Sequence, residues 1–387
     1  MTYPMEMPLN DNSQKALELH VKLRGKIEMR AKTPIQDMAD LALVYTPGVG
    51  AVSQQIADHP EDADRLTWRK NTVAVVSDGS AVLGLGNLGP AAALPVMEGK
   101  CAIFKQFAGI DAIPIVLATQ DVEQIIATVK AIAPSFGAIQ LEDISSPRCF
   151  EIEQRLQAEL TIPVMHDDQH GTAIVVLAGL INALKVVGKR MEEVRVVQSG
   201  AGAAGIAIAK LLMQAGVRHF IAVDRQGAIF AEREGLNEEK KMLAAFTNKD
   251  SLRGALADVA RGADVLIGVS GPGTFTKEIA ESLARGSIVF ALANPVPEIL
   301  PDVAREAGIM VLATGRSDFP NQINNALCYP GLFRGMLDQG VMHITDTIKI
   351  RAAEAIAGMI GEPTAERIIP TLFDVGLVEK VAGSVKA

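Results

Sequence analysis

The segment VRVVQSGAGAAGIAIAKLL, residues 194–212, decides the fold that we predict for this chain. An apolar run typical of a buried strand leads into Gly200, Gly202 and Gly205, and an alanine-rich helical pattern follows. Gly200 permits a tight turn, Gly202 lets a pyrophosphate approach the backbone, and Gly205 lets the helix pack closely on the sheet. A glycine-rich turn without a ligand is the alternative, but this context favours a dinucleotide site. Its predicted contacts are Gly200, Ala201, Gly202, Ala203, Ala204 and Gly205.

The next predicted strand ends at Asp224, 24 residues after Gly200. A carboxylate at this position holds the ribose 2′-hydroxyl group of NAD and repels the 2′-phosphate group of NADP. Arg225 follows immediately and offers a positive charge to such a phosphate. We therefore expect NAD as the cofactor, with NADP as the alternative.

Apolar runs of strand length alternate with helical patterns along the rest of the chain. The predicted strands are 72–77, 113–118, 138–141, 162–165, 194–198, 220–224, 265–269, 288–293 and 310–313, and the predicted helices include 13–31, 91–108, 122–132 and 147–160. Such alternation predicts parallel βαβ units in an α/β protein. We predict an N-terminal α/β domain with a parallel sheet (residues 1–150) and a doubly wound, Rossmann-like NAD(P)-binding domain with C-terminal helices (residues 160–387).

The composition restricts the class of protein and its partners. A length of 387 residues, 49% of them hydrophobic, suits two domains with large cores. The formal net charge of −8 argues against a nucleic-acid partner, which requires a basic face. The three cysteines are far apart, the N-terminus lacks a basic and apolar leader, and the most apolar stretch (172–188) is interrupted by Asn182 and Lys185. These features predict a cytoplasmic protein with no membrane partner.

Two acidic pairs stand at the carboxyl ends of predicted parallel strands. The pairs are Glu142-Asp143, after the strand 138–141, and Asp167-Asp168, after the strand 162–165 and His166. Ligand sites in open α/β sheets lie at this edge, and four converging carboxylates repel one another unless a cation is present. Oxygen ligands of this kind suit Mg²⁺ or Mn²⁺. Helix-capping acids are the alternative, because a helical pattern begins at about Thr172.

Two histidines, His166 and His170, flank the second acidic pair at a spacing that zinc sites use. The residues between them lack the general-base glutamate of the H-E-x-x-H motif. We therefore do not predict zinc-dependent hydrolysis.

Lys100 and Tyr45 are candidates for proton transfer. Lys100 lies in a largely apolar helical pattern, where burial close to a divalent cation disfavours the ammonium form. We expect a lowered pKa, which suits a general base. Tyr45 is a phenol held just before Pro47 and Gly48. The alternatives are a surface lysine and a half-buried core tyrosine.

Two further segments carry small or neutral polar residues. The glycine cluster 84–89 also matches G-x-G-x-x-G, but no strand leads directly into it, so we interpret it as backbone close to a small substrate or as a structural turn. Asn294 follows the strand 288–293, and Asn324 and Asn325 lie in the loop 315–331. These amides suit a carboxylate or a nicotinamide, with turn formation as the alternative.

Taken together, these segments resemble the malic enzyme family over nearly the whole chain. The segments that carry the resemblance are YTPGV (45–49), SDGSAVLGLGNLG (77–89), PVMEGK (95–100), LED (141–143), HDDQHGTA (166–173), SGAGAAG (199–205), NP (294–295) and NNALCYPG (324–331). The resemblance implies an NAD(P)-dependent and metal-dependent oxidoreductase that converts (S)-malate to pyruvate and CO₂. It also implies the small bacterial or archaeal form of the family and a homodimer.

The resemblance also implies the roles of individual residues. Tyr45 is the expected general acid, Lys100 the expected general base and a substrate contact, and Asp167 a partner of Lys100. The expected metal ligands are Glu142, Asp143 and Asp168. The expected substrate contacts are Asn294, Asn324 and Asn325, and Asn294 is also expected to touch the cofactor. One departure is Ala81, where long members of the family carry an arginine for a malate carboxylate. Another group, from this chain or a neighbouring subunit, must bind that carboxylate.

Two other functions remain open at this stage. A malolactic enzyme, with tightly held NAD and lactate as product, shares these motifs. A regulatory module that senses NAD or malate without catalysis needs neither an acid nor a base, so the presence of Tyr45 and Lys100 argues against it.

Overall fold

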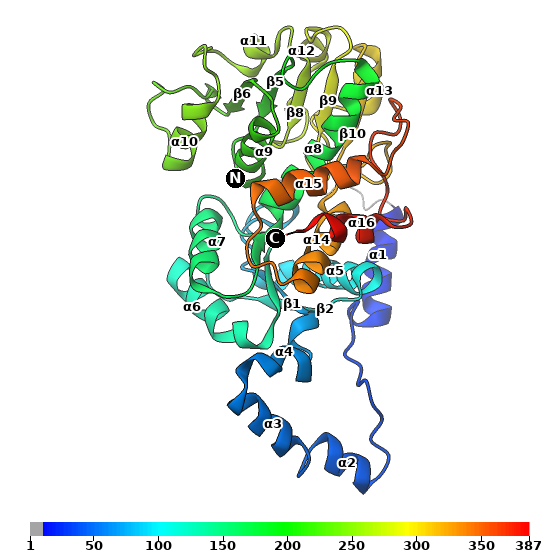
Figure 1. Cartoon of the computed structure of the whole chain (residues 1–387). Coiled ribbons are helices and arrows are strands. Elements are labelled where there is room, and N and C mark those ends of the chain that lie inside the picture. The colour runs from blue at the N-terminus through cyan, green and yellow to red at the C-terminus, as the bar shows by residue number, and fades with distance from the viewer. Residues whose placement is uncertain (1–10, 387) are drawn as a thin grey trace.

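The computed structural model describes residues 11–386 of the chain (Figure 1). The strands are β1 (Thr72–Ser77), β2 (Asp111–Val116), β3 (Ala138–Leu141), β4 (Val164–His166), β5 (Arg195–Ser199), β6 (His219–Asp224), β7 (Gly227–Ala228), β8 (Val265–Gly268), β9 (Ile288–Ala291) and β10 (Val311–Thr314). The α-helices of the N-terminal half are α1 (Asp11–Leu23), α2 (Met38–Val44), α3 (Val49–Asp58), α4 (Ala63–Leu66), α5 (Pro90–Ala108), α6 (Val122–Ile132), α7 (Arg148–Glu159) and α8 (Asp167–Val187). Those of the C-terminal half are α9 (Ala203–Gln214), α10 (Glu238–Phe246), α11 (Leu256–Ala260), α12 (Lys277–Glu281), α13 (Pro301–Glu306), α14 (Tyr329–Gln339), α15 (Asp346–Ala357) and α16 (Leu377–Ser384). Short 3₁₀ turns are η1 (Pro60–Asp62), η2 (Arg69–Asn71), η3 (Val82–Gly84), η4 (Ala133–Ser135) and η5 (Asn325–Leu327).

The first sheet, sheet A, has four parallel strands in the order β2-β1-β3-β4. Alternate residues of a strand point to opposite faces. On β1, Val73 and Val75 belong to the cluster that includes α5, whereas Ala74 and Val76 pack with α6 and α7. Every residue of β1 and β3 is buried, as expected for strands covered on both faces.

The second sheet, sheet B, has six strands in the order β10-β9-β8-β5-β6-β7. All are parallel except the two-residue edge strand β7, which pairs antiparallel with β6 and was absent from our prediction. The chain moves outward from β5 to β7 and then returns to β8 on the other side of β5. The carboxyl ends of β5 and β8 therefore flank the topological switch point, where open α/β sheets bind ligands. These two sheets confirm the predicted α/β class; the division at residues 150–160 stays a prediction.

Helix α8 joins the two sheets. It begins at Asp167, directly after β4 of sheet A, and most of its residues are buried in the core that also contains β5, β8 and α9 of sheet B. It is long and apolar enough to cross a membrane, but 67% of its most apolar window is buried within the protein. The most apolar stretch of the sequence, residues 172–188, thus belongs to a largely buried core helix that begins at Asp167.

The N-terminal segment differs most from the prediction. We predicted a helix over 13–31, but α1 ends at Leu23 because Arg24 and Gly25 adopt positive φ angles of 56° and 111°. The chain then extends to α2, α3 and α4, which project from the rest of the molecule (Figure 1). Neither α2 nor α3 contains a buried residue. Our prediction that no secretory leader is present rests partly on residues 1–10, which lie outside the described residues.

Candidate active site

The two acidic pairs meet at the carboxyl edge of sheet A. Glu142 and Asp143 follow β3, and Asp168 lies in the first turn of α8 after β4, the neighbouring strand. One carboxylate oxygen from each of these three residues lies within 4.8 Å of the others. Parallel strands that pair side by side thus bring together side chains that are 25 positions apart in the sequence, as we predicted.

The backbone around Asp143 fixes the shape of this cluster. Asp143 adopts a left-handed conformation, with φ of 54°, which aspartate tolerates better than most residues. Its backbone N–H group donates to Asp168 Oδ2 at 2.8 Å, and its own Oδ1 atom accepts from the N–H group of Leu83 at 3.3 Å. The buried Oδ2 atom of Asp143 has no hydrogen-bond partner among residues 11–386. Asp168 therefore bonds across to the β3 edge, which argues against the capping alternative.

The electrostatics of the cluster favour a cation. Burial and the charge of Glu142 raise the pKa of Asp143 to about 7, and burial and the charge of Asp143 raise the pKa of Asp168 to about 7. Burial also raises the pKa of Glu142 well above its usual range, although the Lys100 ammonium opposes this shift. Three crowded carboxyl groups, one with an unpartnered buried oxygen, fit the oxygen-ligand set of Mg²⁺ or Mn²⁺.

Lys100 lies beside this cluster, on α5. Its Nζ atom is 2.6 Å from Asp167 Oδ2 and 3.0 Å from Glu142 Oε1, and its side chain is 12% exposed. The ammonium also lies 4.6 Å from the ring centroid of Tyr329. The surface-lysine alternative is therefore wrong.

Our expectation of a lowered Lys100 pKa is also wrong for the chain without a metal. Burial lowers this pKa, but the charges of Asp167 and Glu142 outweigh burial and raise it well above its ordinary value. The apolar neighbours on α5 and a nearby cation would lower the pKa, but the fold also places two carboxylates against the amine.

The predicted asparagines lie at different distances from Lys100. Asn325 Oδ1 accepts a hydrogen bond from Lys100 Nζ at 3.0 Å, so this residue joins the cluster. The side chain of Asn324 instead accepts from the N–H group of Ala326 and caps a short turn, which corresponds to the turn alternative. Asn294 is an exposed residue of the loop after β9, and its carbonyl oxygen is 3.5 Å from where a Cβ atom of Gly84 would lie. The β9 loop and the glycine cluster 84–89 thus approach each other.

Tyr45 does not join the cluster. It ends helix α2 on the projecting segment, and it is 66% exposed. The described contacts between elements place α2 against α3. A role for Tyr45 as general acid within the site of its own chain is therefore wrong for this structure.

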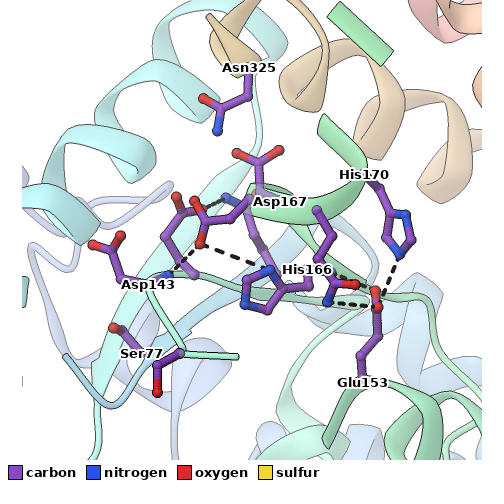
Figure 2. A network of polar contacts seen from close by, with 12 residues as sticks. Ser77, Asp143, Glu153, His166, Asp167, His170 and Asn325 are labelled. Atoms are coloured by element: carbon purple, nitrogen blue, oxygen red, sulfur yellow. Dashed lines mark hydrogen bonds and ion pairs between the residues drawn. The ribbon is translucent and has the colours of Figure 1, made fainter. Parts of the chain in front are cut away.

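The two histidines face different partners (Figure 2). His170 Nε2 lies 3.0 Å from Glu153 Oε2, whereas His166 Nδ1 lies 3.9 Å from Asp168 Oδ2. Burial lowers the pKa of His166 to about 4. Since the rings do not converge on one point, the geometry gives no support to a zinc site built on both.

Glu153, the buried partner of this segment, was not among the predicted site residues. Glu153 accepts from the backbone N–H group of His166 at 2.7 Å and from Gln169 and His170, so it holds the start of α8 in place. A signal was available. Cys149, Ile152, Glu153 and Leu156 form the buried stripe of α7, and an acid within an apolar stripe indicates a buried polar partner.

The glycine-rich turn after β5 has the geometry that a dinucleotide requires. Gly200 has φ of 111°, and a Cβ atom there would lie 2.4 Å from the carbonyl oxygen of Val269. A Cβ atom on Gly205 would lie 2.2 Å from the oxygen of Gly200. A Cβ atom on Gly202, by contrast, meets no atom within 4 Å in the part of the chain that the structure describes. The turn is therefore tightly packed at Gly200 and Gly205 and open at Gly202, at the N-terminus of α9, where a pyrophosphate fits.

Asp224 ends β6 as predicted, but its carboxylate is already paired. Arg233 donates to Oδ1 at 2.7 Å and Lys240 to Oδ2 at 2.6 Å. Burial opposes ionisation of Asp224, but these cations and the N–H group of Gln226 hold its pKa below the usual range. The negative charge that we expected to exclude a 2′-phosphate is thus partly compensated by two cations that the sequence argument did not consider.

Comparison with known proteins identifies relatives along most of the chain. A family model described as "Malic enzyme, N-terminal domain" matches residues 24–157, and one described as "Malic enzyme, NAD binding domain" matches residues 169–386. An NAD-dependent malic enzyme from Geobacillus stearothermophilus is 56% identical over 93% of this chain and 76% of its own. A bifunctional malic/malolactic enzyme from Bacillus subtilis is 52% identical over 96% of this chain and 92% of its own. An NADP-dependent malic enzyme from Halomonas elongata is 46% identical over the same shares of the two chains.

A solved structure agrees with this result. The crystal structure of an NAD-dependent malic enzyme from Thermotoga maritima superposes with a TM-score of 0.92 at 50% sequence identity. The superposition covers 95% of this chain and 98% of the Thermotoga chain, so it includes both sheets and the helix between them.

Proposed function

The chain belongs to the malic enzyme family of oxidoreductases, and we propose that it converts (S)-malate to pyruvate and CO₂. In this proposal the enzyme oxidises malate and decarboxylates the product, with a divalent cation and NAD as cofactors. The observation that carries the proposal is the contact of Lys100 with Asp167 and Glu142 beside the carboxylates of Asp143 and Asp168. A buried amine next to a cation site is the arrangement that proton abstraction from a hydroxyl group requires. We expect the enzyme to act in the cytoplasm.

We assign the metal to Glu142, Asp143 and Asp168. When bound, Mg²⁺ or Mn²⁺ would supply a Lewis acid for the C2 oxygen of malate and of its oxidised product, and the nicotinamide would supply the hydride acceptor. The three carboxyl groups hold and orient the cation, and their mutual repulsion makes the site favour a bound charge of +2.

Lys100 acts as the general base in this proposal. It takes the proton of the C2 hydroxyl group of malate, and Asp167, 2.6 Å away, receives or shares that proton. Asn325 orients the amine through its Oδ1 atom. Glu142 stabilises the ammonium in the metal-free chain, so engagement of Glu142 by a cation removes one of the anions that keep the Lys100 pKa high.

We assign the general acid to Tyr45 of a second copy of this chain, in a homodimer. The tyrosine protonates C3 of the enol product. Support comes from the segment that carries it: Leu41, Val44, Val49 and Val52 of α2 and α3 are all more than a third exposed, as apolar surfaces that pack on another subunit are. The same second copy is also a source for the group that binds a carboxylate of malate, since Ala81 cannot bind it.

Co-expression of Tyr45→Phe with Lys100→Ala chains tests this sharing. If Tyr45 acts across the dimer, mixed dimers contain one site with both groups intact, and activity returns to about a quarter of the wild-type value. If Tyr45 serves its own chain, every site in the mixed dimer lacks one group and activity does not return.

We propose NAD as the preferred cofactor because Asp224 stands where the ribose hydroxyl groups bind. Arg233 and Lys240 weaken the repulsion of a 2′-phosphate, so we expect the preference to be modest. Steady-state rates with NAD and NADP test it, and a clear preference for NADP contradicts the role of Asp224.

An assay with malate, Mn²⁺ and NAD tests the proposed reaction. We expect NADH and pyruvate to appear in equal amounts. Lactate without net NADH instead identifies malolactic chemistry, a second candidate that is favoured by the similarity to a bifunctional relative of nearly the same length. Neither product, with NAD or malate still bound, identifies a sensing module.

A further inference from the structure

Glu298 lies in the loop between β9 and α13, and it is a fully buried carboxylate that the proposed chemistry does not use. We propose that Glu298 is a positioning residue for the nicotinamide half of the dinucleotide site, because its carboxylate fastens the loop after β8 to the loop after β9. This inference rests on the proposed function only in requiring that the chain binds a nicotinamide cofactor.

The two oxygen atoms of Glu298 bind two different loops. Oε1 accepts from the backbone N–H group of Ser270, after β8, at 2.9 Å. Oε2 accepts from the backbone N–H group of Ala293, after β9, also at 2.9 Å. Both hydrogen bonds are partly buried, and one side chain supplies both acceptors.

The surrounding backbone leaves room for this carboxylate. A Cβ atom on Gly268, the last residue of β8, would lie 2.4 Å from Cδ of Glu298. A glycine is therefore needed at this strand end if Glu298 is to reach both loops. Burial raises the pKa of Glu298, while the hydrogen bonds from Ser270 and Ala293 oppose that shift. The carboxylate is thus held by hydrogen bonds from the backbone.

The two fastened loops lie next to the glycine-rich turn. The hydroxyl group of Ser270 lies 3.0 Å from that of Ser199, the last residue of β5, and the chain at Val269 touches the site of Gly200. The β9 loop continues directly from Ala293 to Asn294, the predicted nicotinamide contact. Because β5, β8 and β9 are neighbours and the switch point lies between β5 and β8, a dinucleotide bound at β5 extends its second half over these loops.

A glutamine cannot replace this carboxylate without loss. A carboxylate accepts with both oxygens, whereas an amide has one oxygen and one NH₂ group. In Glu298→Gln, either Ser270 or Ala293 therefore turns its N–H group toward an NH₂ group. One of the two hydrogen bonds is lost and the loop that made it is held less firmly, although backbone bonds such as Phe275 N–H to Glu298 O remain. Strands β5 and β6 and the glycine-rich turn are unchanged.

Two ligands separate positioning of the nicotinamide half from a general effect on the fold. NADH occupies the whole site, and 5′-AMP occupies only the half over β5 and β6. In Glu298→Gln we expect the Kd of NADH, measured by fluorescence without malate or metal, to rise about tenfold, the order of effect of losing one hydrogen bond to a charged group. We expect the Kd of 5′-AMP, measured by calorimetry, to stay within about twofold. The matched control is Glu306→Gln, an exposed glutamate of α13 that pairs with Lys277; it should change neither Kd.

The outcomes separate the two claims. Unchanged NADH affinity in Glu298→Gln, or an equal loss for NADH and 5′-AMP, overturns the positioning role. If that variant does not fold, Glu298→Asp, which keeps two acceptor oxygens on a shorter side chain, is measured in the same way. A loss confined to NADH supports the inference, and any other pattern overturns it. Failure of the wild-type chain to bind NADH overturns the proposed function itself.

Discussion

The two sheet edges bind charge in opposite ways. At sheet A, the carboxyl groups of Glu142, Asp143 and Asp168 crowd together, and Lys100 supplies one positive charge. At sheet B, the glycine-rich turn offers backbone N–H groups and open space at Gly202. At sheet A the carboxylates repel one another until a cation binds, whereas at sheet B the backbone already has the conformation that the dinucleotide requires. We therefore expect mutations at sheet A to act through charge and those at sheet B through shape.

Removal of the base at sheet A should have the largest effect. We expect Lys100→Ala to lower the turnover number for malate oxidation by about 10²- to 10⁴-fold, because proton abstraction is lost. The Kd of NADH should be largely unchanged, because sheet B is untouched. Lys105→Ala, on the same helix but 65% exposed, is the matched control. Near-normal turnover in Lys100→Ala would refute its role as base.

Removal of one metal ligand should separate affinity from stability. In Asp168→Asn we expect Mn²⁺ affinity to fall by at least about tenfold, since one anionic ligand is lost. The metal-free variant should nevertheless melt no lower than the metal-free wild type, because one of several repelling carboxylates is removed and the amide oxygen still accepts from Asp143 N–H. Calorimetric titration and thermal melts with and without Mn²⁺ measure both. A metal-free variant that melts well below the wild type contradicts this account of the edge.

Two glycine variants test the role of shape at sheet B. Gly202 has φ of −90°, and a Cβ atom there meets nothing, so Gly202→Ala should fold with an unchanged Tm. Its methyl group occupies the space reserved for the pyrophosphate, and we expect a rise of about tenfold in the Kd of NADH. Gly205→Ala should instead lower the Tm, because its methyl group meets the oxygen of Gly200. Normal NADH binding by Gly202→Ala argues against this position for the pyrophosphate.

Removal of the Asp224 charge at sheet B should have the smallest effect of these changes, and the effect should be on stability. The pKa of Asp224 is lowered in the folded chain, so its ion pairs contribute stability above the ordinary value of 3.8 and lose that contribution as the pH falls through the lower, folded value. The urea midpoint of Asp224→Asn should therefore lie slightly below that of the wild type at pH 7. The two midpoints should converge as the pH falls below the folded pKa of Asp224. A difference that grows as the pH falls has the wrong sign for this account.

Much of the fold followed from local pattern. The strands 72–77 and 138–141 and the helix 122–132 have the predicted bounds, because apolar runs and turn residues define them within a few positions. The acidic cluster was predictable as well, since parallel neighbouring strands must bring their carboxyl ends together. Strand β7 was missed because two residues carry no periodicity.

The remaining features depend on partners far away in the sequence. The Lys100 pKa is set by Asp167 and Glu142, which local sequence around Lys100 does not reveal. Glu298 reads as a loop residue, although the fold buries it between two strand ends. Tyr45 looked like part of one active site, and the structure places it on a projecting helix. The catalytic and ligand roles of the site residues stay predictions.

A crystal structure of the chain soaked with Mn²⁺, with an anomalous difference map, tests the central claim most directly. We predict one strong peak per chain within bonding distance of carboxylate oxygens from Glu142, Asp143 and Asp168, with the Lys100 amine beside it. A map with no peak between these three residues, or with its main peak elsewhere, would contradict the account.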